Sequence, residues 1–411
     1  MRVGKSGHLS YCSNIHPAET WEDTFKNLEL YLIVVKQEVC KDQPFGIGLR
    51  LSNRAALELS DKKTLESFKI WLRQNNLYVF TLNGFPFGNF HGEVIKDKVH
   101  LPDWTTDLRK DYTLLLFDIL AKLTEEGGTS GISTSPLTYR YWHSSEQELE
   151  EVKTKACKQL IAVVYHLMQI KKNSGKSMHL DIEPEPDGLL ENSEEYVAFF
   201  KDYLLDQGTI FLQKKSNCSL KEAKDAIREH IQLCWDVCHF SIAYERPSSI
   251  LAELKKEGLK VGKIQISAAL KCRLTEDNNM DQLQSYLRPF DEANYLHQAV
   301  IQTNGNNFLK FPDLNKAITA MDTMETETSA GFKELRTHFH VPVFLAEYQN
   351  LQSTQDDIIE TLDLWKQEEF TDHLEIETYT WEVLPDQMQT DITTAITREI
   401  NWVKQEIGKL K

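Results

Sequence analysis

The stretch that decides the fold prediction is Ile231-Gln-Leu-Cys-Trp-Asp236-Val-Cys-His239, in which an apolar run leads directly into an acid and a histidine. A short apolar run without helical period is typical of a strand buried on both faces. In parallel α/β sheets, the residues that carry out chemistry follow the carboxyl ends of the strands, where Asp236 and His239 stand. Taken alone, the two residues fit a helix-capping aspartate and an ordinary loop histidine at least as well.

Similar strand patterns recur along the chain and alternate with helical patterns. About nine short segments have the composition of strands: 9–15, 45–51, 77–82, 132–137, 178–182, 231–235, 262–267, 337–344 and 374–381. Helical spacing of apolar residues fills most of the gaps, as in the segment 145–167. Strands that alternate with helices predict a parallel sheet, and about eight such units close a (β/α)8 barrel. One of the strands is therefore surplus.

The later part of the chain departs from this alternation. Residues 270–335 contain no strong strand pattern, and we expect them to form an insertion over the barrel mouth. Isoleucine and valine at helical spacing predict an amphipathic closing helix at about 388–411. The chain has no internal repeat and no linker rich in proline or glycine, which favours a single α/β domain over residues 1–411.

The composition excludes several classes of function. Lys and Arg number 46 against 62 Asp and Glu, and a net charge of -16 repels nucleic acid and anionic membranes. No stretch is apolar enough to insert in a membrane, and no secretory signal or glycine-rich nucleotide motif is present. Seven scattered cysteines without a CxxC pair indicate reduced thiols. We therefore expect a cytoplasmic protein without a nucleic-acid partner and without direct membrane insertion.

The predicted strand ends collect carboxylates, amides and imidazoles. They are His16, Asn83, Glu183, Glu185, Asp236, His239, Gln265, His338, His340, Glu375 and Glu377. Oxygen and nitrogen donors that converge from separate strands fit a divalent metal such as Mn²⁺, Zn²⁺, Mg²⁺ or Co²⁺. Residues two apart on a strand share a face, so in each of the pairs Glu375/Glu377 and His338/His340 one residue can bind and the other support it. A solvated strand end is the alternative for each pair.

Three of these motifs, Ile182-Glu183-Pro184, Asp236-x-x-His239 and Ile376-Glu377-Thr378, resemble strand ends of the xylose-isomerase-like TIM barrels, which include sugar epimerases and relatives of endonuclease IV. Longer runs resemble the EboE group of metabolite traffic proteins: 8–16, 82–91, 295–298, 338–342 and 377–381. This resemblance extends over nearly the whole chain. The long runs are specific, whereas the Asp-x-x-His motif alone is weak.

The resemblance implies roles for the residues that match. Glu183, Asp236 and Glu377 would bind the metal, and the two glutamates would also move a proton at the carbon beside a carbonyl. His239 would contact the substrate or support the site, and it is counted with Glu183 and Glu377 as catalytic.

The chain departs from the superfamily on its seventh strand. There the superfamily implies a histidine ligand, and this chain has Gln265. A neutral amide is a poorer ligand than imidazole for a transition metal. Either His338 or His340 supplies the missing imidazole, or the metal site is weakened, and we include His340 in the predicted ligand set. The residues predicted to surround the substrate are His16, Asn83, Gln265, His338, Tyr379 and Trp381.

Two functions are compatible with these residues. The first is a metal-dependent isomerase or epimerase of a sugar or sugar phosphate. The second is a non-catalytic barrel that holds a metabolite for hand-over, which Gln265 and the long insertion favour. The resemblance to the EboE group also implies a role in metabolite export beside a membrane prenyltransferase-type partner. Phosphodiester cleavage is disfavoured, because the acidic chain would repel DNA.

Overall fold

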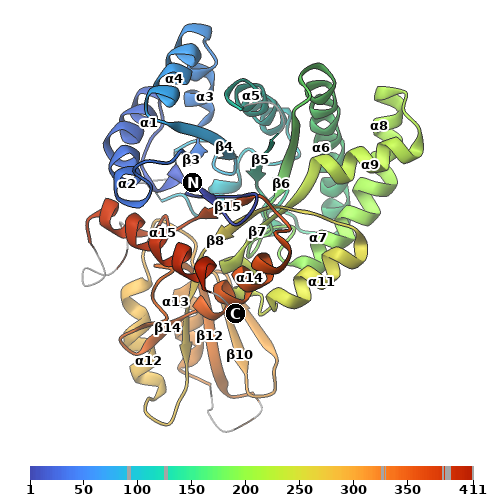
Figure 1. Cartoon of the computed structure of the whole chain (residues 1–411). Coiled ribbons are helices and arrows are strands. Elements are labelled where there is room, and N and C mark those ends of the chain that lie inside the picture. The colour runs from blue at the N-terminus through green and yellow to red at the C-terminus, as the bar shows by residue number, and fades with distance from the viewer. Residues whose placement is uncertain are drawn as a thin grey trace.

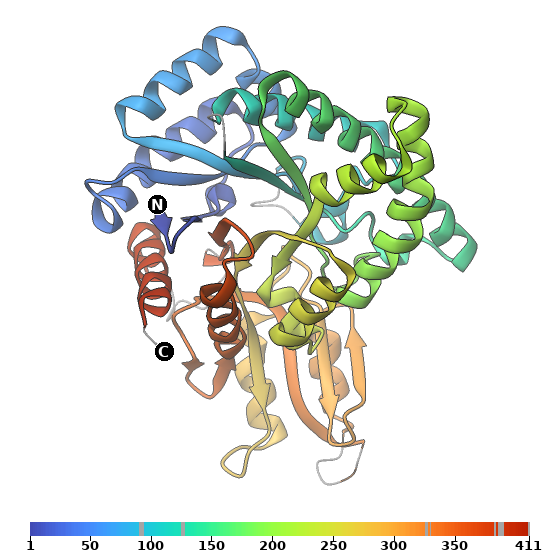
Figure 2. The same cartoon turned by 45° about the vertical axis from the view of Figure 1, so that its right-hand side comes forward.

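Eight parallel strands of the computed structural model form a barrel (Figures 1 and 2). The structure describes residues 1–89, 94–124, 128–324, 328, 330–381, 384 and 390–409. The barrel strands are β2 (Gly7–Tyr11), β3 (Phe45–Arg50), β4 (Leu77–Asn83), β5 (Thr129–Thr134), β6 (Ser177–Ile182), β7 (Ile231–Asp236), β8 (Val261–Ile266) and β15 (His373–Ile376). The last strand pairs in parallel with both β2 and β8, and a bridge between Cys12 and Gly48 joins β2 to β3. The predicted (β/α)8 fold is confirmed.

Helices cover the outside of the barrel. In chain order they are α1 (Trp21–Asn27), α2 (Ile33–Val39), α3 (Asn53–Leu59), α4 (Lys62–Gln74), α5 (Asp107–Leu123), α6 (Glu146–Ser174), α7 (Ser193–Phe199), α8 (Thr209–Ser216), α9 (Leu220–His230), α10 (Val237–Ile242), α11 (Pro247–Glu257), α14 (Gln355–Glu368) and α15 (Ile392–Gly408). The longest, α6, begins where the Ser145 side chain accepts a hydrogen bond from the Glu148 backbone, and it ends at Gly175 in the left-handed conformation. All six residues of β7 are buried, as its apolar run predicted.

The barrel interior holds a buried ion pair below its mouth. Lys263 on β8 lies 2.7 Å from Oε2 of Glu375 on β15, and neither side chain is exposed. Burial lowers the pKa of Lys263, but Glu375, with smaller contributions from Cys234 and Cys12, more than offsets this effect and raises that pKa above its usual range. A side chain at Gly48 would meet Glu375, since an added Cβ would lie 1.8 Å from its Oε1. Glu375 therefore fills the barrel core, whereas Glu377 reaches the mouth.

Between β8 and β15 the chain forms a second, six-stranded antiparallel sheet, the lower part of both views (Figures 1 and 2). Its strands are β9 (Ala268–Arg273), β10 (Ala299–Thr303), β11 (Phe308–Phe311), β12 (Phe332–Val341), β13 (Glu347–Tyr348) and β14 (Leu351–Ser353), with helices α12 (Met280–Leu287) and α13 (Leu314–Met321). We refer to this segment, residues 268–353, as the insertion.

The insertion corrects one sequence prediction and confirms another. The prediction that residues 270–335 contain no strong strand was wrong, because β9, β10 and β11 lie there. These strands are short, and β9 and β10 both pair with β12, far along the chain, so the local pattern carries little signal. The surplus strand is confirmed: β12 covers most of the predicted segment 337–344 and lies outside the barrel.

The predicted closing helix corresponds to α15, and residues 388–389 and 410–411 of the predicted range lie outside the described residues. Its buried face includes Ile396, Ile400 and Val403. The same face carries Glu399, whose Oε1 accepts hydrogen bonds from Thr378 Oγ1 and the Val343 backbone. Among the described helices, none combines the length and the apolar character that a membrane span requires.

Candidate metal centre and substrate pocket

A cavity of about 80 Å³ lies where the carboxyl ends of the barrel strands meet the insertion. Most of the residues predicted from the strand ends line it: Asn83, Glu183, Glu185, His239, His338, His340, Glu377 and Tyr379. The barrel supplies the carboxylates, and strand β12 of the insertion supplies two of the imidazoles. The site therefore lies at the barrel face where chemistry is expected in this architecture.

Three carboxylates meet at this face. Oxygen atoms of Glu183, Asp236 and Glu377 lie within 4.8 Å of one another, and all three residues are buried. They stand at or just after the ends of β6, β7 and β15. Asp236 Oδ1 accepts hydrogen bonds from Ser267 Oγ (2.7 Å) and the His239 backbone (3.1 Å). Its Oδ2 has no hydrogen-bond partner among the described residues, so one buried carboxylate oxygen is available as a ligand.

Glu377 is held in place by three amide donors. Its Oε1 accepts from Asn14 (2.6 Å) and Asn83 (2.9 Å), and its Oε2 accepts from the Gln265 side chain. Gln265 does not line the cavity but lies behind Glu377, where its Oε1 accepts from the Cys234 thiol at 2.7 Å. Gln265 therefore reaches the site as a support for Glu377 rather than as a wall of the substrate pocket.

The crowding of these carboxylates changes their acidity. Burial, together with the charges of Glu377 and Asp236, raises the pKa of Glu183 well above its usual value. Burial and the Asp236 charge do the same to the pKa of Glu377. Burial would also raise the pKa of Asp236, but His239, His340 and the hydrogen bonds from Ser267 and the His239 backbone together lower that pKa. A divalent cation among the three would relieve both the repulsion and the desolvation.

The imidazoles of His239, His338 and His340 are each fixed by one hydrogen bond from Nδ1. His239 donates to the Pro184 carbonyl at 2.9 Å, and His340 donates to the Glu377 carbonyl at 2.8 Å. His338 Nδ1 lies 2.9 Å from Oε1 of Gln298. In each ring the hydrogen bond uses Nδ1 and leaves Nε2 as the nitrogen that can bind a metal. This arrangement is usual for histidines that bind metals.

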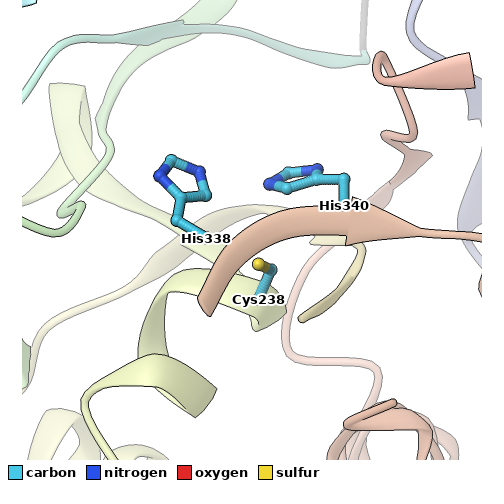
Figure 3. A group of neighbouring side chains, drawn as sticks. All are labelled: Cys238, His338 and His340. Atoms are coloured by element: carbon cyan, nitrogen blue, oxygen red, sulfur yellow. The ribbon is translucent and has the colours of Figure 1, made fainter. Parts of the chain in front are cut away.

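These imidazoles fall into two groups of potential ligands. Asp236, His239 and His340 form one, and Cys238, His338 and His340 form the other, with ligand atoms within 4.8 Å of one another in each. Figure 3 shows the rings of His338 and His340 side by side on β12, with Cys238 on α10 close by. Burial lowers the pKa of both His338 and His340, which favours the neutral, metal-binding form.

Besides Gln265, two residues predicted to surround the substrate, His16 and Trp381, are not among the described residues that line the cavity. The His16 ring stacks on Tyr31 with ring centroids 4.4 Å apart, and its Nε2 lies 3.1 Å from the Tyr11 hydroxyl. Trp381 is buried in the hydrophobic core. Both positions follow a strand by several residues.

Several polar residues that line the cavity had no predicted role, among them Asn14 and His100. Asn14 comes from the short turn after β2 and binds Glu377. His100, from the connection between β4 and α5, lies 2.9 Å from Glu185. Asn14 falls inside a run that resembles the EboE group, whereas His100 lies in a loop without periodic pattern, so no local signal marks it.

The donor set fits a divalent metal. It combines buried carboxylates with oriented imidazoles, and two of its atoms, Asp236 Oδ2 and His340 Nε2, lack a hydrogen-bond partner in the described part of the chain. Buried polar atoms are normally satisfied, and an ion bound at this site would supply the partner that these two atoms lack.

No model of a known protein family matches this chain, and no protein of curated function matches it. Among solved structures, a xylose isomerase-like TIM barrel protein from Mycobacterium smegmatis, solved in complex with magnesium, is 12% identical with a TM-score of 0.51, covering 99% of this chain and 98% of that one. The IOLI protein with a bound zinc atom is 12% identical over 97% of this chain and 98% of that one, with a TM-score of 0.46. The probable 3-DHS dehydratase AsbF from Bacillus anthracis is also 12% identical, over 96% and 97%, with a TM-score of 0.43. The first of these likenesses shows that the chain has the fold of the xylose-isomerase-like TIM barrels.

Proposed function

We propose that this protein is a metal-dependent isomerase or epimerase that moves a proton at the carbon beside a carbonyl of a small sugar or related hydroxylated compound. The observation that carries this proposal is the convergence of Glu183, Asp236 and Glu377, from three strand ends, around an unpartnered buried oxygen of Asp236. These carboxylates would hold the ion, and the predicted fourth ligand, His340, lies in the adjoining group with Asp236. When bound, a divalent ion would polarise the substrate carbonyl and so acidify the neighbouring C–H.

The surroundings of the two glutamates favour different roles. Glu377 accepts hydrogen bonds from three amides, which stabilise its charged form. The hydrogen-bond donor to Glu183 is much weaker, since it is the Cys234 thiol at 3.7 Å from Oε2. Glu183 is therefore the better candidate to take the proton from carbon, while the three amides hold Glu377 in place as a ligand. His239, between Pro184 and Asp236, supports the site.

The lining of the cavity favours an uncharged substrate. Lys96 is the one lysine or arginine among the described lining residues, and its ammonium group is paired with Asp313. Asn83 and Gln298 contribute neutral amides to this wall, and Tyr379 offers an aromatic face. A neutral hydroxylated carbonyl compound suits this wall better than a phosphate ester, whose charge would face Glu183 and Glu185.

The test combines metal content with proton exchange. Protein purified without chelator should contain a divalent ion, and Glu183→Ala and Glu377→Ala should lose it. In D₂O the wild type should also exchange the proton beside the carbonyl in a panel of ketoses and keto acids, and both variants should lose this exchange. Glu185→Gln is the matched control, because it alters a carboxylate of the same cavity that lies outside the three-carboxylate group. A wild-type protein that binds neither Mn²⁺ nor Zn²⁺ would sink the proposal.

Gln265 favours the second candidate, a barrel that holds a metabolite for hand-over without converting it. An amide stands on β8 where the superfamily resemblance implies a histidine ligand. This function predicts a ligand that co-purifies with the protein and saturable binding without any proton exchange. Exchange catalysed at the same site would rule it out.

The finer role rests on the long runs that resemble the EboE group. We propose that the protein acts in the cytoplasm on a metabolite destined for export, beside a membrane prenyltransferase-type partner. Cell fractionation and affinity capture of the full chain from membranes solubilised in detergent test this role. Capture of the protein without any integral membrane prenyltransferase would contradict the proposed partner.

A further inference from the structure

We infer that the cavity holds a second metal ion, of the zinc type, between the imidazoles of His239, His338 and His340, with Asp236 shared between the two ions. The inference goes beyond the proposed function, because it concerns a site to which the insertion contributes two ligands. It starts from the orientation of the three rings.

The hydrogen bonds leave only one tautomer for each neutral imidazole. Nδ1 of His239 and Nδ1 of His340 face backbone carbonyls, which can only accept, so each Nδ1 carries the proton. Nδ1 of His338 faces the Gln298 amide, whose nitrogen donates to the Pro186 carbonyl at 3.0 Å. The oxygen of that amide therefore points at His338, whose Nδ1 also donates. Every Nε2 is left with a lone pair.

Two of these lone pairs face each other. Nε2 of His239 and Nε2 of His338 are 3.1 Å apart, and in the neutral rings neither carries a proton to donate. Two acceptors at this separation repel unless a cation lies between them. Two nitrogens bound at 2.0–2.1 Å to one tetrahedral zinc ion are separated by roughly 3.3 Å. The observed distance is therefore close to that of two ligands of one ion.

The other two donors complete a set of four. His340 Nε2 and Asp236 Oδ2 are buried and have no hydrogen-bond partner among the described residues. Ligand atoms of Asp236, His239 and His340 lie within 4.8 Å of one another, and so do those of His338 and His340. Three imidazoles and one carboxylate form a donor set that suits Zn²⁺.

The second site differs in chemistry from the first. Glu183 and Glu377 offer only hard oxygen ligands, which suit Mg²⁺ or Mn²⁺. The imidazole group offers nitrogen ligands, and only Asp236 belongs to both groups. The two sites should therefore take up different metals from a mixture, and each should be lost through its own variants.

The experiment measures metal content per chain in the full-length protein after incubation with Mn²⁺ and Zn²⁺ and removal of unbound ions. We expect two ions in the wild type. His338→Ala should lose the zinc ion and keep the manganese ion, whereas Glu183→Ala should do the reverse. His230→Ala is the matched control, since His230 is also buried but lies on α9 and donates to the Met178 carbonyl. It should keep both ions.

A second variant guards against misfolding of the first. Gln298→Leu leaves all ligands in place but removes the acceptor for His338 Nδ1, and it should weaken zinc binding about 10–100-fold without weakening manganese binding. In the Glu183→Ala background, Co²⁺ should show the intense visible absorption of a tetrahedral site, and His338→Ala should abolish it. Far-ultraviolet circular dichroism checks that each variant is folded.

Three results would overturn the inference. One is a single ion per chain that His338→Ala retains, which would mean that a shared proton separates the two rings. Another is a content of two ions in His338→Ala. The third is a sulfur-to-cobalt band that Cys238→Ser removes, which would replace Asp236 by the thiolate as the fourth ligand.

Discussion

The Gln265 amide donates a hydrogen bond to Oε2 of Glu377, and its own oxygen accepts one from the Cys234 thiol. Strand β8 therefore contributes to the carboxylate group through Glu377 rather than by binding an ion itself. The amide fixes the direction of one carboxylate oxygen, and Asn14 and Asn83 fix the other. Donors of this kind around a ligand commonly set its affinity for the metal.

The first prediction follows from this contact. Gln265→Leu leaves Oε2 of Glu377 without its donor, and we expect the affinity for Mn²⁺ to fall about 10–100-fold. Isothermal titration calorimetry measures the change. The control is Gln232→Leu, which removes a side-chain amide from neighbouring β7 that donates to the Glu229 carbonyl, away from the cavity. Equal affinities in Gln265→Leu and wild type would contradict the supporting role.

The second prediction concerns pH and metal binding. The raised pKa values of Glu183 and Glu377 mean that, without an ion, these carboxylates hold protons to a higher pH than ordinary glutamates. An ion must displace these protons, so affinity should fall as the pH is lowered from about 8 to about 5, with proton release on binding. Calorimetry in buffers of different ionisation enthalpy counts the protons. Binding without proton release at about pH 6 would refute it.

The third prediction concerns the ion pair in the barrel core. Lys263→Met leaves Glu375 as an uncompensated buried charge, and we expect a loss of about 3–5 kcal/mol in the free energy of unfolding. Urea denaturation measures it. The double variant Lys263→Met, Glu375→Met removes both charges and should recover most of the loss. If the double variant is as unstable as the single one, packing rather than charge explains the effect.

The fourth prediction concerns Glu399 on α15. Burial raises the pKa of this carboxyl from 4.5 to about 7. The folded protein thus binds more protons than the unfolded chain between about pH 4.5 and 7, so this group's contribution is fully present below that window and is lost as the pH rises through it. The loss is about 3 kcal/mol, from two to three pKa units at about 1.4 kcal/mol each.

Glu399→Gln removes this titration while it keeps an oxygen to accept from Thr378 and the Val343 backbone. The variant should therefore be more stable than wild type above about pH 7 and should lose the dependence within the window. Thermal unfolding across a pH series measures both. Glu406→Gln, on the same helix but paired with the exposed Lys409, is the control. If the stability of Glu399→Gln declines with pH as much as that of the wild type, another group causes the decline.

The barrel was predictable because its signals are local. The run from Ile231 to Trp235 is apolar at every position but one and becomes a fully buried strand, and α6 follows the spacing of its own apolar residues. The position of Glu183, Asp236 and Glu377 at one face follows from the same pattern, since parallel strands end together.

The insertion was harder to predict because its strands depend on distant partners. Strand β9 follows β8 after Ser267 alone, so one apolar stretch hides two strands that belong to different sheets. The contribution of His100 to the cavity rests on a loop, which has no periodic pattern. The support that Gln265 gives to Glu377 depends on the fit of side chains, which spacing along the chain does not reveal.

The pairing of β15 with both β2 and β8 also constrains how the protein is made. During synthesis the first seven barrel strands leave the ribosome in order, but the wall stays open until residues 373–376 emerge, after the whole insertion. The unpaired edges of β2 and β8 remain available for wrong pairing during that interval. Glu377 directly follows the strand that seals the wall, so closure of the barrel and completion of the three-carboxylate group are one event.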